Sequence, residues 1–190
     1  KNGKRAGNGT IYLRTPGQAI DEGTLVIDAM DPQCAPAGDL GAGIHPGQDG
    51  ITVGRVEIRK WGALQLQRNC TLNVKGDFAN DSTGVIVGDL GDSETPQGTV
   101  AFVDAARESR ITGTNEFSRL LCAVPGKTLR FGGEGSLCRI VTSGLLDIRG
   151  EEGTPIYLRG PVDGTYWNLA MEGSAPLAYA DVKDSDASQG

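Results

Sequence analysis

The sequence predicts an all-β protein, a right-handed parallel β-helix (β-solenoid) in which the chain winds through stacked coils. Short apolar bursts recur about every ten residues from Val100 to Tyr179. Within a burst the apolar residues take alternate positions, which is the pattern of a strand with one buried face. Turn residues (Gly, Pro, Asn, Asp and Ser) separate the bursts, and no stretch has the apolar spacing of a helix.

Such a series of strands also fits a sandwich or an antiparallel barrel. A sandwich needs hairpin loops such as Asn-Gly between matched strands, and the sequence has few of them. Similar phrases favour coils of about 20 to 30 residues: LDIRG at 146–150 resembles IYLRG at 156–160, and GTLVI at 23–27 resembles GTVAF at 98–102. The right hand follows from the strong preference of parallel crossovers for it.

The first half of the chain contains strands and two loop insertions. Alternation predicts strands at Thr10–Thr15 and Thr24–Met30. Residues 31–50 hold three prolines and five glycines, which predicts a long loop outside the coils. Further strands are predicted at residues 53–60, 63–67, 71–74 and 85–87, and a second, acidic loop at 89–98. The pattern is cut at both ends, so we expect residues 1–190 to be one solenoid segment of a longer protein.

The stretch from Gly98 to Ser188 resembles a module that recurs in very large predicted surface proteins of environmental bacteria. The shared phrases lie at Thr99–Phe102, Ile111–Phe117, Leu120–Phe131, Leu146–Gly150, Pro155–Arg159, Asp163–Leu169 and Tyr179–Ser188. They cover about half of the chain in the same order. The resemblance implies a β-solenoid fold and a place outside the cell or at its surface, and it implies no chemistry.

The charge and hydropathy of the chain exclude two classes of partner. The net charge is −6 and the isoelectric point is about 4.8, so the surface repels phosphate backbones and we expect no nucleic-acid binding. No run of 18 apolar residues is present, so we expect no membrane span. The partners we expect instead are neighbouring copies or flanking segments of the same protein, and surface glycans.

Four cysteines leave two interpretations open. Their even number permits disulfides in an oxidising compartment, and small buried thiols in a narrow core are the alternative. Cys122 and Cys138 are sixteen residues apart, close to one short coil, so we expect them in neighbouring coils as the first candidate pair. The family pattern has a cysteine at the place of Cys122 only. The remaining candidates are Cys34 and Cys70.

Asp181, Asp184 and Asp186 form the densest acidic patch in the sequence. Calcium takes six to eight oxygen ligands, so three closely spaced carboxylates are candidates for a calcium site. The spacing is not that of an EF-hand, and a polar turn in which Asp and Ser cap their own backbone explains the same residues. Calcium is therefore the one cofactor that the sequence leaves open.

Few residues are candidates for chemistry. His45 is the only histidine and lies in the first loop, where an exposed loop residue is the simpler interpretation. A Ser-His-Asp arrangement would have to use it. Asp28 and Asp31 are the closest carboxylate pair at a strand end, and glycoside cleavage needs a pair about 5 to 9 Å apart. Trp61, beside Gly62, is the candidate for stacking on a sugar.

These observations predict a structural protein without enzymatic activity. We expect a segment of an extracellular bacterial surface protein that acts as a stalk, a fibre or an adhesin-like filament subunit. The alternative is a carbohydrate-active β-helix, either a polysaccharide lyase or hydrolase or a sugar-binding module. The alternative requires carboxylates, basic residues or aromatic rings that converge on one outer face.

Overall fold

The structure is a computed structural model that describes residues 9–29, 42–44, 50–60, 62–66, 68–81, 87–88, 98–133 and 135–186. These residues contain strands and turns but no helix, so the all-β prediction is confirmed for them. The strands are β1 (Gly9–Leu13), β2 (Thr24–Ala29), β3 (Ala42–Ile44), β4 (Ile51–Val53), β5 (Arg55–Lys60), β6 (Leu64–Leu66), β7 (Thr71–Val74), β8 (Phe78–Asn80), β9 (Val87–Gly88), β10 (Thr99–Phe102), β11 (Ser109–Thr112), β12 (Thr114–Cys122), β13 (Thr128–Phe131), β14 (Leu137–Arg149), β15 (Ile156–Arg159), β16 (Trp167–Met171), β17 (Leu177–Ala178), β18 (Ala180–Val182) and β19 (Ser185–Asp186).

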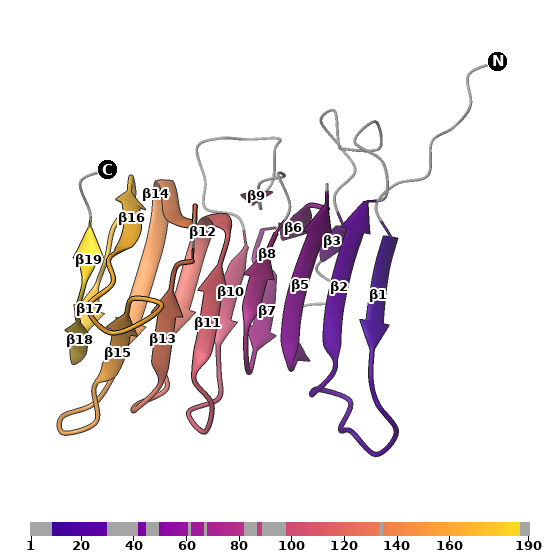
Figure 1. Ribbon diagram of the computed structural model, residues 1–190, viewed down its shortest axis with the longest axis horizontal. Coiled ribbons are helices and arrows are strands. Elements are labelled where there is room, and N and C mark those ends of the chain that lie inside the picture. Colours follow the sequence, from indigo (N-terminus) through magenta and orange to yellow (C-terminus); the bar gives the residue numbers. More distant parts are fainter. Residues whose placement is uncertain are drawn as a thin grey trace.

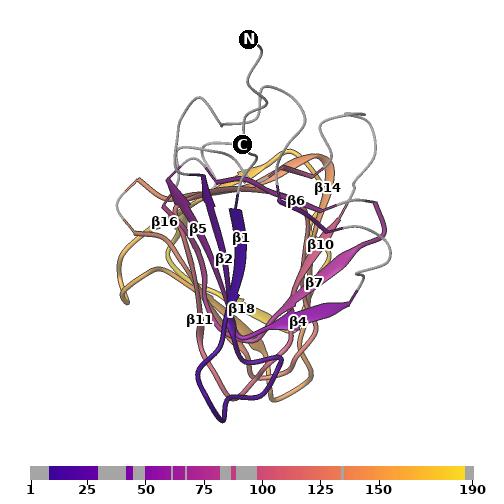
Figure 2. The ribbon, with the colours of Figure 1, turned by 90° about the vertical axis from the view of Figure 1, so that its right-hand side faces the viewer.

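The strands form three sheets that share one long axis (Figure 1). Sheet 1 has the order β1-β2-β5-β8-β11-β13-β15-β18. Sheet 2 has the order β19-β16-β14-β12-β10-β7-β4, with β17 beside β14, and sheet 3 has the order β3-β6-β9. The chain visits the sheets in turn, and seen along the axis they surround a common interior (Figure 2).

Parallel pairing dominates the described strands. Every pairing between two of them is parallel except that of β1 with β2. The chain returns to the same position one strand further on after 20 residues between Ile111 and Phe131, and after 33 between Phe78 and Ile111. The number of residues per return differs because the connections between the strands differ in length. The strands therefore stay in register although the connections differ in length.

The register aligns the apolar side chains in rows that fill the interior. In sheet 2, Val74, Phe102, Cys122 and Ile148 lie opposite one another on successive strands, and all four are buried. Similar rows hold the apolar bursts that the sequence analysis expects to stack inward: Val100, Phe102, Leu129, Phe131, Leu146, Ile148, Ile156 and Leu158, all of which are buried. Removing these side chains from water is the main free-energy term that favours the fold.

Two corners contain residues with positive φ, a backbone conformation that glycine adopts most easily. At Gly113, between β11 and β12, φ is +83°, and a Cβ there would lie 1.6 Å from the carbonyl oxygen of Asn80 in the preceding corner. The long strand β14 turns a corner without a break, at Ser143 (φ +61°) and Gly144. Close backbone approach at each corner thus fixes the stacking distance between neighbouring turns.

Two parts of the N-terminal region differ from the sequence predictions. The expected strand Thr10–Thr15 is β1, which pairs antiparallel with β2 because the connection between them is a hairpin. The expected loop at residues 31–50 contains β3, which pairs with β6. The remainder of this loop lies outside the described residues except Gly50, and of the loop at 89–98 only Gly98 is described.

Candidate functional site

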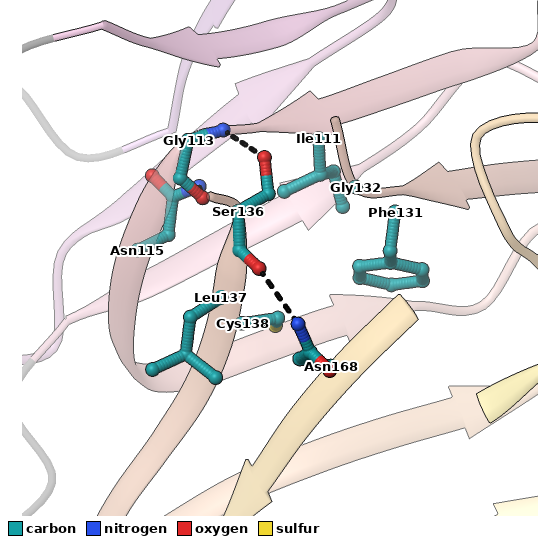
Figure 3. Close-up of a pocket in the computed structure, with 9 residues that line it drawn as sticks. All are labelled: Ile111, Gly113, Asn115, Phe131, Gly132, Ser136, Leu137, Cys138 and Asn168. Carbon is teal, nitrogen blue, oxygen red and sulfur yellow. Dashed lines mark hydrogen bonds between the residues drawn. The ribbon is translucent and has the colours of Figure 1, made fainter. Parts of the chain in front are cut away.

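A narrow hollow lies where the corner before β12 meets the corner before β14 (Figure 3). It is lined by Ile111, Gly113, Asn115, Phe131, Gly132, Ser136, Leu137, Cys138 and Asn168. Ser136 holds it together: its Oγ accepts a hydrogen bond from the Gly113 amide at 2.9 Å, and its carbonyl accepts one from Asn168 Nδ2 at 3.3 Å. The space between these side chains does not admit a water molecule.

None of the residues that line the hollow is an Asp, Glu, His, Lys or Arg, and its only hydroxyl and thiol are those of Ser136 and Cys138. Asn115 is fully buried, and its Nδ2 donates to the carbonyls of Thr112 at 3.0 Å and Gly113 at 3.2 Å. Its Oδ1 is buried without a hydrogen-bond partner. Burial raises the pKa of the Cys138 thiol to about 12, so this thiol is protonated at neutral pH. The hollow is therefore a structural corner.

Lys127 is a buried cation that the sequence analysis does not single out. Its side chain is fully buried, and Nζ donates to the carbonyl of Arg107 at 2.6 Å and to the carbonyl of Lys75 at 3.2 Å. Those carbonyls belong to the corners after β10 and β7. Burial lowers the pKa of Lys127. One side chain thus links three successive corners from the inside.

Ion pairs link the same corners from the outside. Lys75 Nζ lies 2.6 Å from Asp21 Oδ2 and 2.7 Å from Glu22 Oε1, and Arg107 Nη2 lies 2.6 Å from Glu22 Oε2. Hydrogen bonds from Lys75 lower the pKa of both carboxyls, and Arg107 adds to the effect at Glu22. The same bonds raise the pKa of Lys75. These charges face one another rather than a substrate.

Arginines follow one another across the outer face of sheet 1. Arg110, Arg130 and Arg159 occupy equivalent positions on β11, β13 and β15. Neighbouring strands lie about 4.8 Å apart, so a linear anion could in principle contact them in turn. However, Arg130 Nε lies 2.8 Å from Glu108 and its Nη1 lies 3.0 Å from Asp163. Carboxylates of the protein itself therefore already pair with the central arginine of this row.

The three candidate calcium ligands are not gathered around one point. Asp181 Oδ2 lies 2.9 Å from Arg159 Nη2, and Asp184 Oδ2 accepts a hydrogen bond from the Gly164 amide at 3.1 Å. Asp186 ends β19, where it lies opposite Asn168. Within the described ranges no three His, Cys, Asp or Glu side chains are close enough to hold a metal ion. Asp181 contacts the neighbouring strand β15, and Asp184 contacts the connection between β15 and β16.

The structure does not join Cys122 to Cys138. Three cysteines are described and all are buried: Cys70, Cys122 and Cys138, of which Cys122 and Cys138 are free thiols. The register places Cys122, at the end of β12, opposite Ile148 near the end of β14, and Cys138, near the start of β14, opposite Asn115. Because β14 is thirteen residues long, Cys138 and the partner of Cys122 are ten residues apart on it. Cys34 lies outside the described residues.

Two neighbouring aromatic residues, Tyr166 and Trp167, have opposite environments. Trp167 is buried and stacks on Phe131 with ring centroids 4.3 Å apart, so it belongs to the core. Tyr166, its neighbour in the chain, is 74% exposed. Trp61, the sugar-stacking candidate, lies outside the described residues. Tyr166 is therefore the most exposed aromatic ring in the described part of the chain.

The catalytic candidates do not assemble in the described residues. His45 and Asp31 lie outside them. Asp28 lies on β2 with Oδ1 3.4 Å from Lys60 Nζ.

In the described part of the chain no helix is long and apolar enough to cross a membrane. No protein-family model, curated protein or solved structure matches the sequence of this chain.

Proposed function

We propose that the chain is a right-handed parallel β-helix and serves as a structural segment of an extracellular bacterial surface protein. Parallel pairing and the return to each sheet after 18 to 33 residues support the β-helix. The right hand is the one that parallel crossovers adopt in almost all known cases. In this role the segment is a stalk, a fibre or an adhesin-like filament subunit, and it has no enzymatic activity.

The observation that carries the proposal is that both apolar and charged side chains connect successive coils. The row from Val74 to Ile148 runs through four strands of sheet 2, and Lys127 crosses three corners. Arg130 bridges Glu108 and Asp163 on the outside. A stack linked in this way resists bending and keeps its two ends apart, which is what a spacer at a cell surface requires.

The family resemblance supports the same role. It links residues 98–188 to a module repeated in very large bacterial surface proteins, and the strands β10 to β19 occupy this stretch. In a protein of that kind the partners of this segment are the coils before and after it, or neighbouring copies of the chain. The described residues add no site whose geometry would assign a reaction.

Localisation provides the test of this proposal. An antibody raised against residues 98–186 is applied to intact cells of the source bacterium and to cells permeabilised with detergent. We expect intact cells to be labelled as strongly as permeabilised cells, and treatment of intact cells with an external protease to remove the signal. Labelling that requires permeabilisation would contradict an extracellular role.

A sugar-binding module is the second candidate, and the exposed ring of Tyr166 favours it. This ring lies in the connection from β15 to β16, which also contains Asp163. Aromatic rings of this kind stack on the apolar faces of sugars. A panel of acidic and neutral polysaccharides tests it by calorimetry. Binding lost in Tyr166→Ala but kept in Val162→Ala would support it, and release of reducing ends would point to a hydrolase or lyase.

A further inference from the structure

The strand β1 reverses the direction of sheet 1. Every other pair of neighbouring strands in this sheet is parallel, whereas β1 folds back along β2 as a hairpin. A coil that came before β2 would place a parallel strand on the free edge of β2. β1 occupies that edge instead, and seen along the long axis it lies in front of the common interior (Figure 2).

The side of β1 that faces the interior lacks the apolar residues of the parallel strands. The register places Thr10 opposite Ile27 and Tyr12 opposite Leu25, and residues directly opposite each other point to the same face of a sheet. All five residues of β1 are exposed. On the strands after β2, the row that begins at Leu25 holds buried apolar side chains: Val56, Phe78, Ile111 and Phe131. β1 thus ends this row with a hydroxyl-bearing surface, as the terminal repeats of stacked proteins do.

The tyrosine of β1 holds the hairpin closed. The Tyr12 hydroxyl donates to the carbonyl of Ile20 and accepts a hydrogen bond from the Gly23 amide at 2.9 Å. A Cβ on Gly23 would lie 2.6 Å from Cζ of Tyr12, so the ring lies directly against this glycine. The side chain that would stack on a preceding coil is therefore committed to contacts within its own hairpin.

Ion pairs fasten the same hairpin to later corners of the stack. Asp21 and Glu22, just before β2, both pair with Lys75, and Glu22 also pairs with Arg107. Lys75 follows β7 and Arg107 follows β10, so two further corners hold the base of the hairpin. This attachment keeps β1 close to the edge of β2, which raises its effective concentration there.

We propose that β1 is a cap, an autoinhibitory contact that keeps the edge of β2 from pairing with a strand of another molecule. An uncovered edge presents a row of unpaired amides and carbonyls, which is a template for another chain. β1 pairs with this row from within the same chain. The proposal rests on the proposed β-helix and adds that the parallel series of sheet 1 ends at β2, whatever residues precede β1.

The backbone shows which positions of β1 bind this edge. The Arg55 amide donates to the Gly23 carbonyl at 3.2 Å, so Gly23 directs that carbonyl toward β5. Backbone groups alternate in direction along a strand, so Val26 directs its amide and carbonyl toward β1, where Ile11 lies opposite. Leu13 is two residues further along β1 and has the same orientation. Substitutions at these two positions therefore test the pairing itself.

Two variants of the full 190-residue chain separate the pairing of β1 from its side chains. The open variant carries Ile11→Pro and Leu13→Pro, because proline has no amide to donate to β2. The matched control carries Ile11→Thr and Leu13→Thr, which changes the same side chains but keeps both amides and a residue that favours strands. Both side chains are more than half exposed, so neither substitution opens the core.

Hydrogen exchange followed by NMR reports the edge of β2. In the open variant we expect the Val26 amide, which faces β1, to lose its protection, while the amides of Leu25 and Ile27, which face β5, keep theirs. The control should match the unmodified chain. Equal protection of Val26 in all three proteins would show that β1 does not cover the edge and would overturn the proposal.

A labelled peptide with the sequence of residues 9–15 (GTIYLRT) reports whether the freed edge takes a strand. We expect it to bind the open variant and restore the protection of Val26, and not to bind the unmodified chain or the control. Light scattering should show the open variant gaining more mass with concentration than the control. An open variant that neither binds the peptide nor gains mass would overturn the cap, and the extracellular role would still stand on the antibody test.

A second variant covers the case in which proline unfolds the chain, which loss of protection in β10, β12 and β14 would reveal. Asp21→Asn with Glu22→Gln removes the charges that fasten the hairpin and leaves β1 unchanged. We expect Val26 to exchange faster in this variant, and in the unmodified chain at high salt, because salt screens the same ion pairs. Exchange of Val26 that responds neither to the substitutions nor to salt would contradict the attachment and with it the cap.

Discussion

Lys127 shows how one residue can stabilise several coils. It is fully buried, and its two backbone acceptors, the carbonyls of Arg107 and Lys75, lie in other corners. Removing one partner of a buried hydrogen bond costs about 1 to 3 kcal/mol. Lys127→Met keeps the length of the side chain but removes the donor to the Arg107 carbonyl and leaves the Lys75 carbonyl with the bond from Ser109 Oγ at 3.4 Å, so we expect it to lower the free energy of unfolding by this order, measured in urea.

The pH dependence of that variant gives a second prediction. Burial holds the pKa of Lys127 in the folded protein below its ordinary value of 10.5. Between the two values the unfolded chain binds more protons than the folded chain, so this lysine makes stability rise with pH toward 10.5. The contribution disappears in Lys127→Met. We expect the stability difference between the two proteins to grow as pH rises through this window, whereas the exposed-site control Lys183→Met should show no such growth.

The buried thiols lead to a prediction about reactivity. Burial raises the pKa of Cys122 and raises that of Cys138 to about 12, and the thiolate is the reactive form. In the folded protein we expect Cys122 and Cys138 to resist iodoacetamide. In urea without a reducing agent both should be alkylated, as intact mass and peptide mapping report. Alkylation of these cysteines that depends on a reducing agent would show a disulfide and contradict the free thiols.

At the scale of single elements, Gly113 and Gly126 together separate two costs of adding a Cβ atom, the strain of a positive φ and the clash with neighbouring backbone. Gly113 has φ +83°, and a Cβ there would lie 1.6 Å from the Asn80 carbonyl oxygen. Gly126 has φ +78° with no atom within 4 Å of such a Cβ. A positive φ costs about 1 to 3 kcal/mol for a residue other than glycine. We expect Gly126→Ala to lose about that much and Gly113→Ala clearly more, by urea unfolding. Equal losses would show that the corner relaxes.

Alternation was enough to predict the strands between residues 99 and 171, because each buries one face and is bounded by turn residues. It did not find β8, since three residues are too few to show a period. Within the range 99–171 it also did not find the first half of β14, where Cys138 and Ile140 are buried and the strand continues through the turn residues Ser143 and Gly144 instead of ending there. The direction of β1 was missed because alternation is the same in parallel and antiparallel strands.

The polar residues of the candidate site were less predictable than the strands. Lys127 and Asn115 are buried by the stacking of corners that are far apart in sequence, so nothing in the local pattern distinguishes them from exposed turn residues. The spacing of Cys122 and Cys138 suggested neighbouring positions, but Cys122 ends β12 and lies opposite Ile148, whereas Cys138 is near the start of β14. The partners of Asp181 and Asp184, Arg159 on β15 and Gly164 in the connection to β16, are about 20 residues away in the sequence, so the local pattern did not show them.

At the scale of the whole molecule, charges tie the N-terminal hairpin to the stack. Asp21 and Glu22 precede β2, and they pair with Lys75 after β7 and, at Glu22, with Arg107 after β10. Both carboxyls have pKa values below their ordinary 3.8 and 4.5, so their contribution to stability is complete above those values and is lost as pH falls through the lower, folded values. This end of the molecule should therefore loosen first in acid.

The register of the strands also determines how the molecule opens. Each strand of a sheet pairs only with the strands before and after it, so the stability of one coil depends on its neighbours and not on closure of the whole chain. A coil in the middle has two neighbours and a terminal coil has one. The coils should therefore fray from the ends inward rather than unfold in one step.

Hydrogen exchange measures this gradient directly. We expect the amides of β10, β12 and β14 to exchange most slowly, and those of β1, β18 and β19 to exchange fastest. Equal protection across all strands would instead indicate a single cooperative unit. If the gradient holds, an insertion in a connection would alter the opening of the adjacent coils only. Coils could then be added or lost in evolution while the remaining coils keep their fold.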